Sequence, residues 1–162
     1  MLQVQSIFFM ILMFIINSAF ASSLDESKVN EFLSAYLNAW KTRDIQEVGK
    51  LYAENVSVYD LPSDSTIKGK QAVLEFEQEA WLASVPDMVW VKTGPAYITG
   101  NTAAYEWVYA GTFTGDWWDA KVDKKSFSIK GISTTTFNDK GKIIVQKDFY
   151  DIKSLEMQLG VE

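Results

Sequence analysis

The second half of the chain has a strand-like pattern almost throughout, and this pattern limits the possible folds more than any other feature. Apolar and polar residues alternate over residues 88–92, 103–113 and 126–137, and again over 141–151. Alternation of this kind is typical of strands with one buried face. Residues 138–141 have the composition of a tight hairpin turn. The sequence therefore predicts a run of adjacent antiparallel strands.

Helical spacing dominates the first half of the chain. Residues 23–26 have the Ser-x-x-Glu spacing of a capping box and precede an apolar stripe of helical period over residues 29–40. Asp44 begins a second capping pattern, and a third helix is expected over residues 70–83 after a strand at 56–61. Helices followed by adjacent strands indicate an α+β fold in which a curved sheet wraps over a helix.

A continuous apolar run stands at the N-terminus. Residues 7–16 are all apolar, and Ala19-Phe20-Ala21 has the small-x-small pattern of a signal-peptidase site. We interpret residues 1–21 as a signal peptide and residues 22–162 as the mature domain, which is then periplasmic or secreted. The alternative is an uncleaved membrane anchor, but a spanning helix needs roughly 20 apolar residues. No stable membrane span is expected after cleavage.

The composition excludes several classes of function. The chain has no histidine and no cysteine, and its net charge is −6. Without histidine there is no Ser-His-Asp triad and no imidazole metal ligand, and without cysteine there is no disulfide framework. An acidic surface argues against nucleic acid or an anionic membrane as a partner. Proton chemistry must therefore rely on Asp, Glu, Tyr or Lys.

Two aspartates mark the end of the last strand. Alternation places Ile144, Gln146, Asp148 and Tyr150 on one face, and Asp151 on the other together with Ile143. Asp151 precedes a helical segment and is expected to cap it. Beside Tyr150, Asp148 is either a pocket residue or a solvated strand end, and the residues alone leave both interpretations open.

Several short words of the sequence match one protein superfamily. They are AW at 39–40 with Asp44, LYAE at 51–54 with Val56, Gly69, EW at 106–107, GT at 111–112 with Gly115, Phe137 with GKI at 141–143, and DFYD at 148–151 before QLG at 158–160. On these residues the chain resembles the SnoaL-like members of the nuclear transport factor 2-like superfamily, over residues 24–160. The resemblance implies a cone-shaped curved mixed sheet around N-terminal helices, with an internal apolar cavity. It also implies a homodimer paired through the outer sheet face.

The resemblance also assigns chemistry to the last strand. A final-strand aspartate activates water in the epoxide hydrolases of the superfamily and is the general acid in the polyketide cyclases, and Asp148 matches both. The Arg and Asp that assist the epoxide hydrolases correspond here to Trp107 and Tyr109, and their Tyr-x-Asn corresponds to Val58 and Asp60. Epoxide hydrolysis by that mechanism is therefore not expected.

The resemblance places a set of strand residues around the implied cavity. The expected catalytic residues are Asp148 and Asp60. The expected substrate-binding residues are Val58, Trp90, Trp107, Tyr109, Gln146 and Tyr150, with Tyr105 also near the mouth. Aromatic walls would desolvate a carboxylate and raise its pKa, which suits general acid–base catalysis. The alternative for Asp60 is an ordinary turn former, and for Trp107 and Tyr109 it is core packing.

The segment 114–125 stands apart from the strand pattern. It is expected to be an irregular insertion, and it contains Trp117 and Trp118. The two tryptophans form either a lid over the cavity or a dimer contact.

These observations lead to one functional hypothesis and one alternative. The hypothesis is an exported protein that binds a small hydrophobic, cyclic molecule and catalyses its isomerisation, cyclisation or hydration with Asp148. No cofactor and no metal are expected. The alternative is a non-catalytic module of the same fold that binds a small ligand or dimerises.

The signal-peptide interpretation predicts the start of the mature protein. Cleavage after Ala21 would give a chain that begins at Ser22. N-terminal sequencing of the protein from its native host should find this start. Retention of residues 1–21 would contradict export by cleavage.

Overall fold

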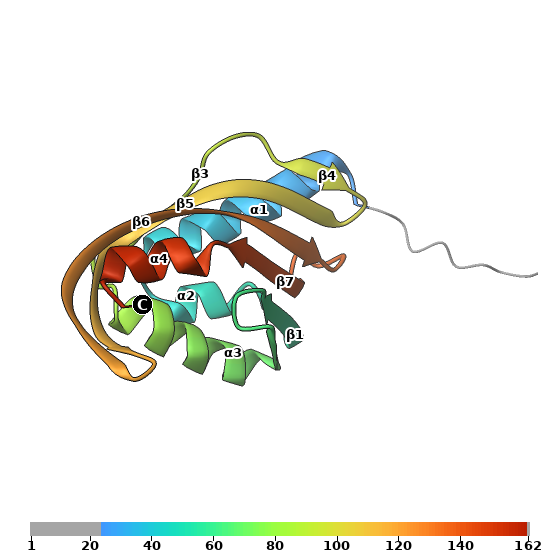
Figure 1. Ribbon diagram of the computed structural model, residues 1–162. Coiled ribbons are helices and arrows are strands. Elements are labelled where there is room, and N and C mark those ends of the chain that lie inside the picture. The colour runs from blue at the N-terminus through green and yellow to red at the C-terminus, as the bar shows by residue number, and fades with distance from the viewer. Residues whose placement is uncertain (1–23, 162) are drawn as a thin grey trace, which may run out of the picture.

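Helices fill the concave side of one strongly curved sheet in the computed structural model, which describes residues 24–161 (Figure 1). The helical segments are α1 (Glu26–Lys41), α2 (Ile45–Gly49), α3 (Lys70–Glu77), the π-helical turn η1 (Gln78–Ala83) and α4 (Ile152–Leu159). The strands are β1 (Tyr52–Asp60), β2 (Ser65–Lys68), β3 (Val89–Lys92), β4 (Tyr97–Thr99), β5 (Thr102–Trp117), β6 (Ala120–Phe137) and β7 (Ile143–Tyr150). The predicted α+β class is confirmed. The interpretation of residues 1–21 as a signal peptide lies outside the described residues.

Aspartates at the N-termini of α1, α2 and α4 set where these three helices begin. Asp25 caps α1 by accepting a hydrogen bond from the Ser27 N–H at 2.7 Å. The predicted capping box at 23–26 is therefore wrong about the capping residue, because the carboxylate of Asp25 already fills that place. Asp44 caps α2 and Asp151 caps α4, as predicted. An aspartate at this position satisfies backbone donors that have no partner inside the helix.

The sheet brings the two ends of the domain together. The strand order is β2-β1-β7-β6-β5-β3, and β4 pairs with the first residues of β5. The β1–β7 pair is parallel, and the other pairs are antiparallel. The long strands β5 and β6 arc over α1 (Figure 1). Parallel pairing of β1 with β7 sets Asp60 directly beside Asp148.

The segment 114–125 is part of a long hairpin. Strand β5 runs on to Trp117 and β6 starts at Ala120, with Gly115 paired to Val122 after a bulge. The prediction of an irregular insertion is wrong because Trp117 packs on Phe113 at 5.6 Å between ring centroids and Val122 is buried, so the strands keep an apolar face. Trp118 lies at the turn with a positive φ and is 74% exposed.

A bulge changes the predicted alternation at the start of β7. Thr136 pairs with Val145 and Phe137 pairs with Ile143, so Ile144 is the extra residue. Ile143 is consequently buried on the same side as Gln146, whereas strict alternation placed it on the opposite face. A bulge inserts one residue without a partner and reverses the alternation beyond it. From Gln146 to Tyr150 the predicted faces hold.

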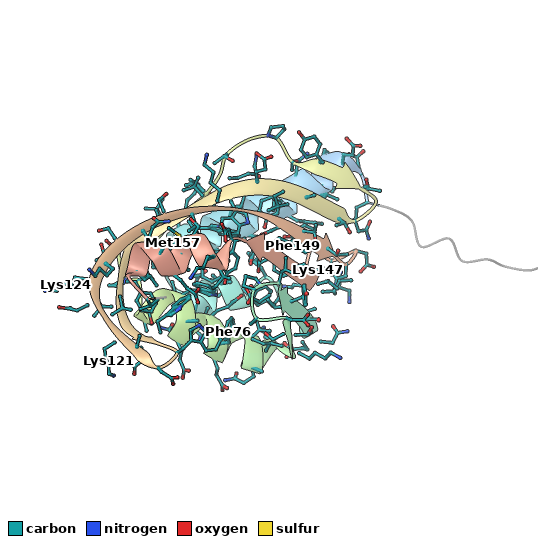
Figure 2. All side chains as sticks on the ribbon, viewed as in Figure 1. Phe76, Lys121, Lys124, Lys147, Phe149 and Met157 are labelled. Atoms are coloured by element: carbon teal, nitrogen blue, oxygen red, sulfur yellow. The ribbon has the colours of Figure 1, made fainter. Side chains whose placement is uncertain are left out.

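The outer sheet face carries exposed apolar side chains. Val89 and Val91 on β3 and Ile132 on β6 are each between 39% and 48% exposed. Lys121 and Lys124 project outward from the β5–β6 hairpin (Figure 2). Pairing of two copies through this face stays a prediction. Within residues 24–161, no helix has the length and apolar character needed to cross a membrane.

Trp107 of β5 lies flat against Gly131, its partner on β6. A Cβ atom at position 131 would stand 2.2 Å from Cζ2 of the Trp107 ring. The glycine therefore makes room for the indole on the concave face. Trp107 is 5% exposed and contacts the rings of Trp90 and Tyr150.

This contact predicts that Gly131→Ala is destabilising. The added methyl group overpacks the indole and should lower the free energy of unfolding by about 1–3 kcal/mol. The matched control is Gly94→Ala, because nothing lies within 4 Å of a Cβ at that position. Urea denaturation of both variants measures the difference. Equal stability of the two variants would contradict the Trp107–Gly131 packing.

Candidate functional site

A cavity of about 80 Å³ lies between the concave face of the sheet and the helices α1, α3 and η1. All eight residues that the sequence proposed for the site line it: Val58, Asp60, Trp90, Trp107, Tyr109, Gln146, Asp148 and Tyr150. Their chemical roles stay predictions. Tyr105 does not line the cavity, contrary to expectation, because its side chain is fully buried and its hydroxyl bonds to Thr135.

Two side-chain donors bind one oxygen of the Asp148 carboxylate. The Ser133 hydroxyl donates to Oδ1 at 2.5 Å, and Nε2 of Gln146 donates to the same oxygen at 2.7 Å. Within the described part of the chain, Oδ2 has no side-chain or backbone donor. One oxygen thus fixes the orientation of the group, and the other remains for a ligand.

Both donors are themselves positioned by neighbouring side chains. Nε1 of Trp107 donates to the Ser133 hydroxyl oxygen at 2.7 Å. The Thr135 hydroxyl donates to Oε1 of Gln146 at 2.6 Å. The hydroxyl oxygen of Thr135 therefore accepts a hydrogen bond from the Tyr105 hydroxyl, 3.0 Å away. Ordered donors of this kind fix the rotamers of the groups that touch Asp148.

Burial raises the pKa of Asp148 to about 6, against an ordinary value of 3.8. The hydrogen bonds from Ser133 and Gln146 act in the opposite direction, and the charge of Asp60 adds to the rise. Desolvation is the larger effect, because removal from water destabilises the charged carboxylate more than the two hydrogen bonds stabilise it. The group therefore changes protonation close to neutral pH.

Asp60 occupies the cavity wall and a turn at the same time. Its Oδ2 accepts hydrogen bonds from the Ser63 hydroxyl at 2.6 Å and from the Ser63 N–H at 3.1 Å. This is the turn-forming geometry that the sequence offered as the alternative. Burial, followed by the charge of Asp60, raises the pKa of Tyr150. Tyr150 is therefore a neutral hydroxyl at neutral pH.

Aromatic side chains make up most of the remaining wall. Trp81 stands edge-on to Tyr109 at 5.5 Å and to Tyr150 at 6.3 Å between ring centroids. Trp90 stands edge-on to Trp107 at 6.3 Å. Rings in this arrangement favour an apolar guest with a π face or a flat edge.

Glu77 is a third carboxyl group of the cavity, and sequence reasoning did not place it in the site. It lies at the end of α3, is 4% exposed and lines the cavity. Its Oε1 accepts a hydrogen bond from the Tyr52 hydroxyl at 2.6 Å. Burial, with a smaller contribution from the charge of Asp148, raises the pKa of Glu77 to about 8. The available signal was its helical spacing from Val73, which puts it on the buried stripe.

The cavity as a whole combines groups that differ in their protonation at neutral pH. It combines a mostly ionised carboxylate, a mostly protonated carboxyl group and neutral tyrosine hydroxyls. Groups whose environments push their pKa values apart are the usual pairing of a base with an acid. No group of three Asp or Glu side chains with the spacing of a metal site occurs among residues 24–161.

Solved structures share this fold at low sequence identity. A candidate SnoaL-like polyketide cyclase from Shewanella denitrificans OS-217 has a TM-score of 0.72 and 20% identity, over 82% of this chain and 96% of that one. A Catenulispora acidiphila DSM 44928 protein with a ketosteroid isomerase-like fold, in complex with trimethylamine, has a TM-score of 0.68 and 20% identity, over 82% and 94%. The epoxide hydrolase/cyclase-like enzyme SalBIII, with a role in pyran ring formation in the polyether salinomycin, has a TM-score of 0.67 and 16% identity, over 80% and 95%.

The sequence itself identifies the family. A comparison with curated protein sequences finds no match. The model of the SnoaL-like polyketide cyclase family, however, matches residues 30–159, which include the three carboxyl groups of the cavity and the rest of its wall. The chain therefore belongs to the SnoaL-like polyketide cyclase family.

Proposed function

We propose that this protein binds a small, apolar, cyclic molecule in the cavity and catalyses a cofactor-free proton transfer on it. The observation that carries the proposal is the Asp148 carboxylate, which lines an aromatic cavity, is oriented through Oδ1 and has no hydrogen-bond donor at Oδ2 among the described residues. An isomerisation, a cyclisation or a hydration each requires such a group. Export to the periplasm or the cell exterior belongs to the same proposal.

The base strength of Asp148 suits this chemistry at neutral pH. A general acid or base works best when its pKa lies near the operating pH. With a pKa of about 6, most Asp148 side chains are ionised at pH 7 and still basic enough to take a proton from an activated carbon or from water. A solvated aspartate would be much weaker as a base.

The size and walls of the cavity limit the substrate. Pockets for drug-sized ligands usually measure roughly 300–1,000 Å³, whereas this cavity measures about 80 Å³. The cavity therefore suits a small molecule of a single ring. Pyran ring formation, in which SalBIII has a role, is a ring-forming reaction like the cyclisation proposed here.

Asp60 and Tyr109 are the groups proposed to orient the substrate. Asp60 faces the cavity beside Asp148, and the Tyr109 hydroxyl lies 3.4 Å from the backbone oxygen of Trp81, a long contact that a substrate oxygen can replace. Burial raises the pKa of Tyr109, so it acts as a neutral donor.

The proposal predicts exchange of α protons in small cyclic ketones. Cyclohexanone and cyclopentanone in deuterated water should take up deuterium faster with the protein than without it, as followed by mass spectrometry. Asp148→Asn should lower the exchange rate by about 100-fold or more, because the amide is no base. The control is Asp139→Asn, an exposed turn residue.

Binding and catalysis give different results in this experiment. If both ketones bind but neither exchanges faster than in buffer, proton transfer is contradicted, and the non-catalytic binding module becomes the better account. Equal exchange by Asp148→Asn and the wild type would remove Asp148 from the reaction.

A further inference from the structure

Glu77, which lines the cavity together with Asp60 and Asp148, has one carboxyl oxygen without a hydrogen-bond partner among the described residues. Oε1 is bonded to the Tyr52 hydroxyl, whereas Oε2 is buried and has no hydrogen-bond partner within the described residues. A buried polar atom without a partner costs free energy, so native proteins rarely leave one. Because Glu77 lines the cavity, a bound ligand is the natural partner for Oε2.

The hydrogen bonds around Glu77 determine where its proton lies. The Tyr52 hydroxyl hydrogen is donated to Oε1, so in the protonated group Oε1 is the carbonyl oxygen and Oε2 carries the hydrogen. The Tyr36 hydroxyl is 3.0 Å from that of Tyr52 and must therefore be the donor of that pair. Glu77 in this state carries one buried O–H donor that no other group among the described residues accepts.

Glu77 and Asp148, two of the three carboxyl groups that line the cavity, are in opposite protonation states at neutral pH. With its pKa raised to about 8 by burial, Glu77 is mostly protonated at pH 7, whereas Asp148 is mostly ionised. The charge of Asp148 helps to keep the proton on Glu77. An acid and a base thus come from opposite walls, one on α3 and the other on β7.

We propose that Glu77 is a second catalytic residue, whose Oε2–H gives a proton to a carbonyl oxygen of the substrate while Asp148 takes one from the adjacent carbon. This inference rests on the proposed function and narrows its substrate class to small cyclic ketones that can enolise. Both residues act on one substrate from different sides.

The proton transfers balance without any cofactor. The C–H bond breaks, its proton goes to Oδ2 of Asp148, and its electron pair forms the C=C bond of the enol. The π pair of the carbonyl group takes the proton from Oε2, which leaves Glu77 as a carboxylate stabilised by the Tyr52 hydroxyl. Asp148 then returns its proton to a ring carbon, the enol O–H returns its proton to Glu77, and the product is a ketone.

The α-proton exchange of cyclohexanone tests this role through Glu77→Gln. The amide keeps the shape of the side chain and its acceptor for Tyr52, but it cannot give up a proton. We expect the exchange rate to fall about 100-fold, with the affinity for cyclohexanone changed by no more than a few-fold. The matched control is Glu79→Gln, two residues further along and exposed, which should exchange at the wild-type rate.

The variants separate this inference from the proposed function. Loss of exchange in Asp148→Asn but not in Glu77→Gln would overturn the role of Glu77 and leave the proposed function intact. Wild-type exchange in both variants, or no exchange by the wild-type protein, would overturn both proposals.

The stability of the protein against pH gives a readout that needs no substrate. The folded pKa of Glu77 lies above its ordinary value of 4.5, so the folded state holds a proton that the unfolded chain releases. The contribution of Glu77 to the free energy of unfolding is therefore fully present below pH 4.5 and is lost as the pH rises through about 8. The surrounding titratable groups are Tyr36 on α1, Tyr52 on β1 and Asp148 on β7. Both tyrosines have a pKa raised well above 10, so neither titrates below pH 8.

Urea midpoints of the folded protein at pH 6.5 and pH 8.5 isolate Glu77 from Asp148. The wild type and Glu79→Gln should both lose stability between these values, and Glu77→Gln should lose distinctly less. If Glu77→Gln and the wild type show the same loss, Glu77 carries no proton at neutral pH and its role as an acid is overturned.

Discussion

Parallel pairing of β7 with β1, combined with antiparallel pairing of β7 with β6, is the constraint on which the site depends. The first pairing sets Asp60 beside Asp148, and the second sets Ser133 opposite Asp148 so that its hydroxyl can reach Oδ1. Closing the sheet over α1 and α3 then removes water from both strands. The carboxylate is consequently buried by the same contacts that hold the domain together.

Desolvation is the main cause of the raised pKa values in the cavity. It is the largest contribution to the raised pKa values of Asp148 and Glu77 and of the tyrosines nearby. Asp148 and Glu77 differ in how they are hydrogen-bonded: Asp148 accepts from two donors, whereas Glu77 accepts from one and has a buried oxygen without a partner among the described residues. This difference in donors agrees with the lower pKa of Asp148.

Much of the fold could be predicted from the sequence because strand alternation and helix caps are local. Asp44 and Asp151 cap helices as expected, and the inward faces of β1 and β7 follow from alternation. The bulge at Ile144 could not be predicted, because it depends on how two strands pair. Glu77 was missed for a related reason: a glutamate on a helix is usually solvated, and only the packing of α3 against β1 buries this one. Its spacing from Val73 was a signal, but not a specific one.

At neutral pH, Asp148 is a basic carboxylate and Glu77 is a protonated carboxyl group in the same cavity. Carboxyl ¹³C NMR of the protein, titrated from pH 3 to pH 9 with Asp148 and Glu77 assigned by their Asn and Gln variants, measures both groups directly. The account predicts midpoints near 6 for Asp148 and near 8 for Glu77. Midpoints for both at about 4, as in model peptides, would contradict it.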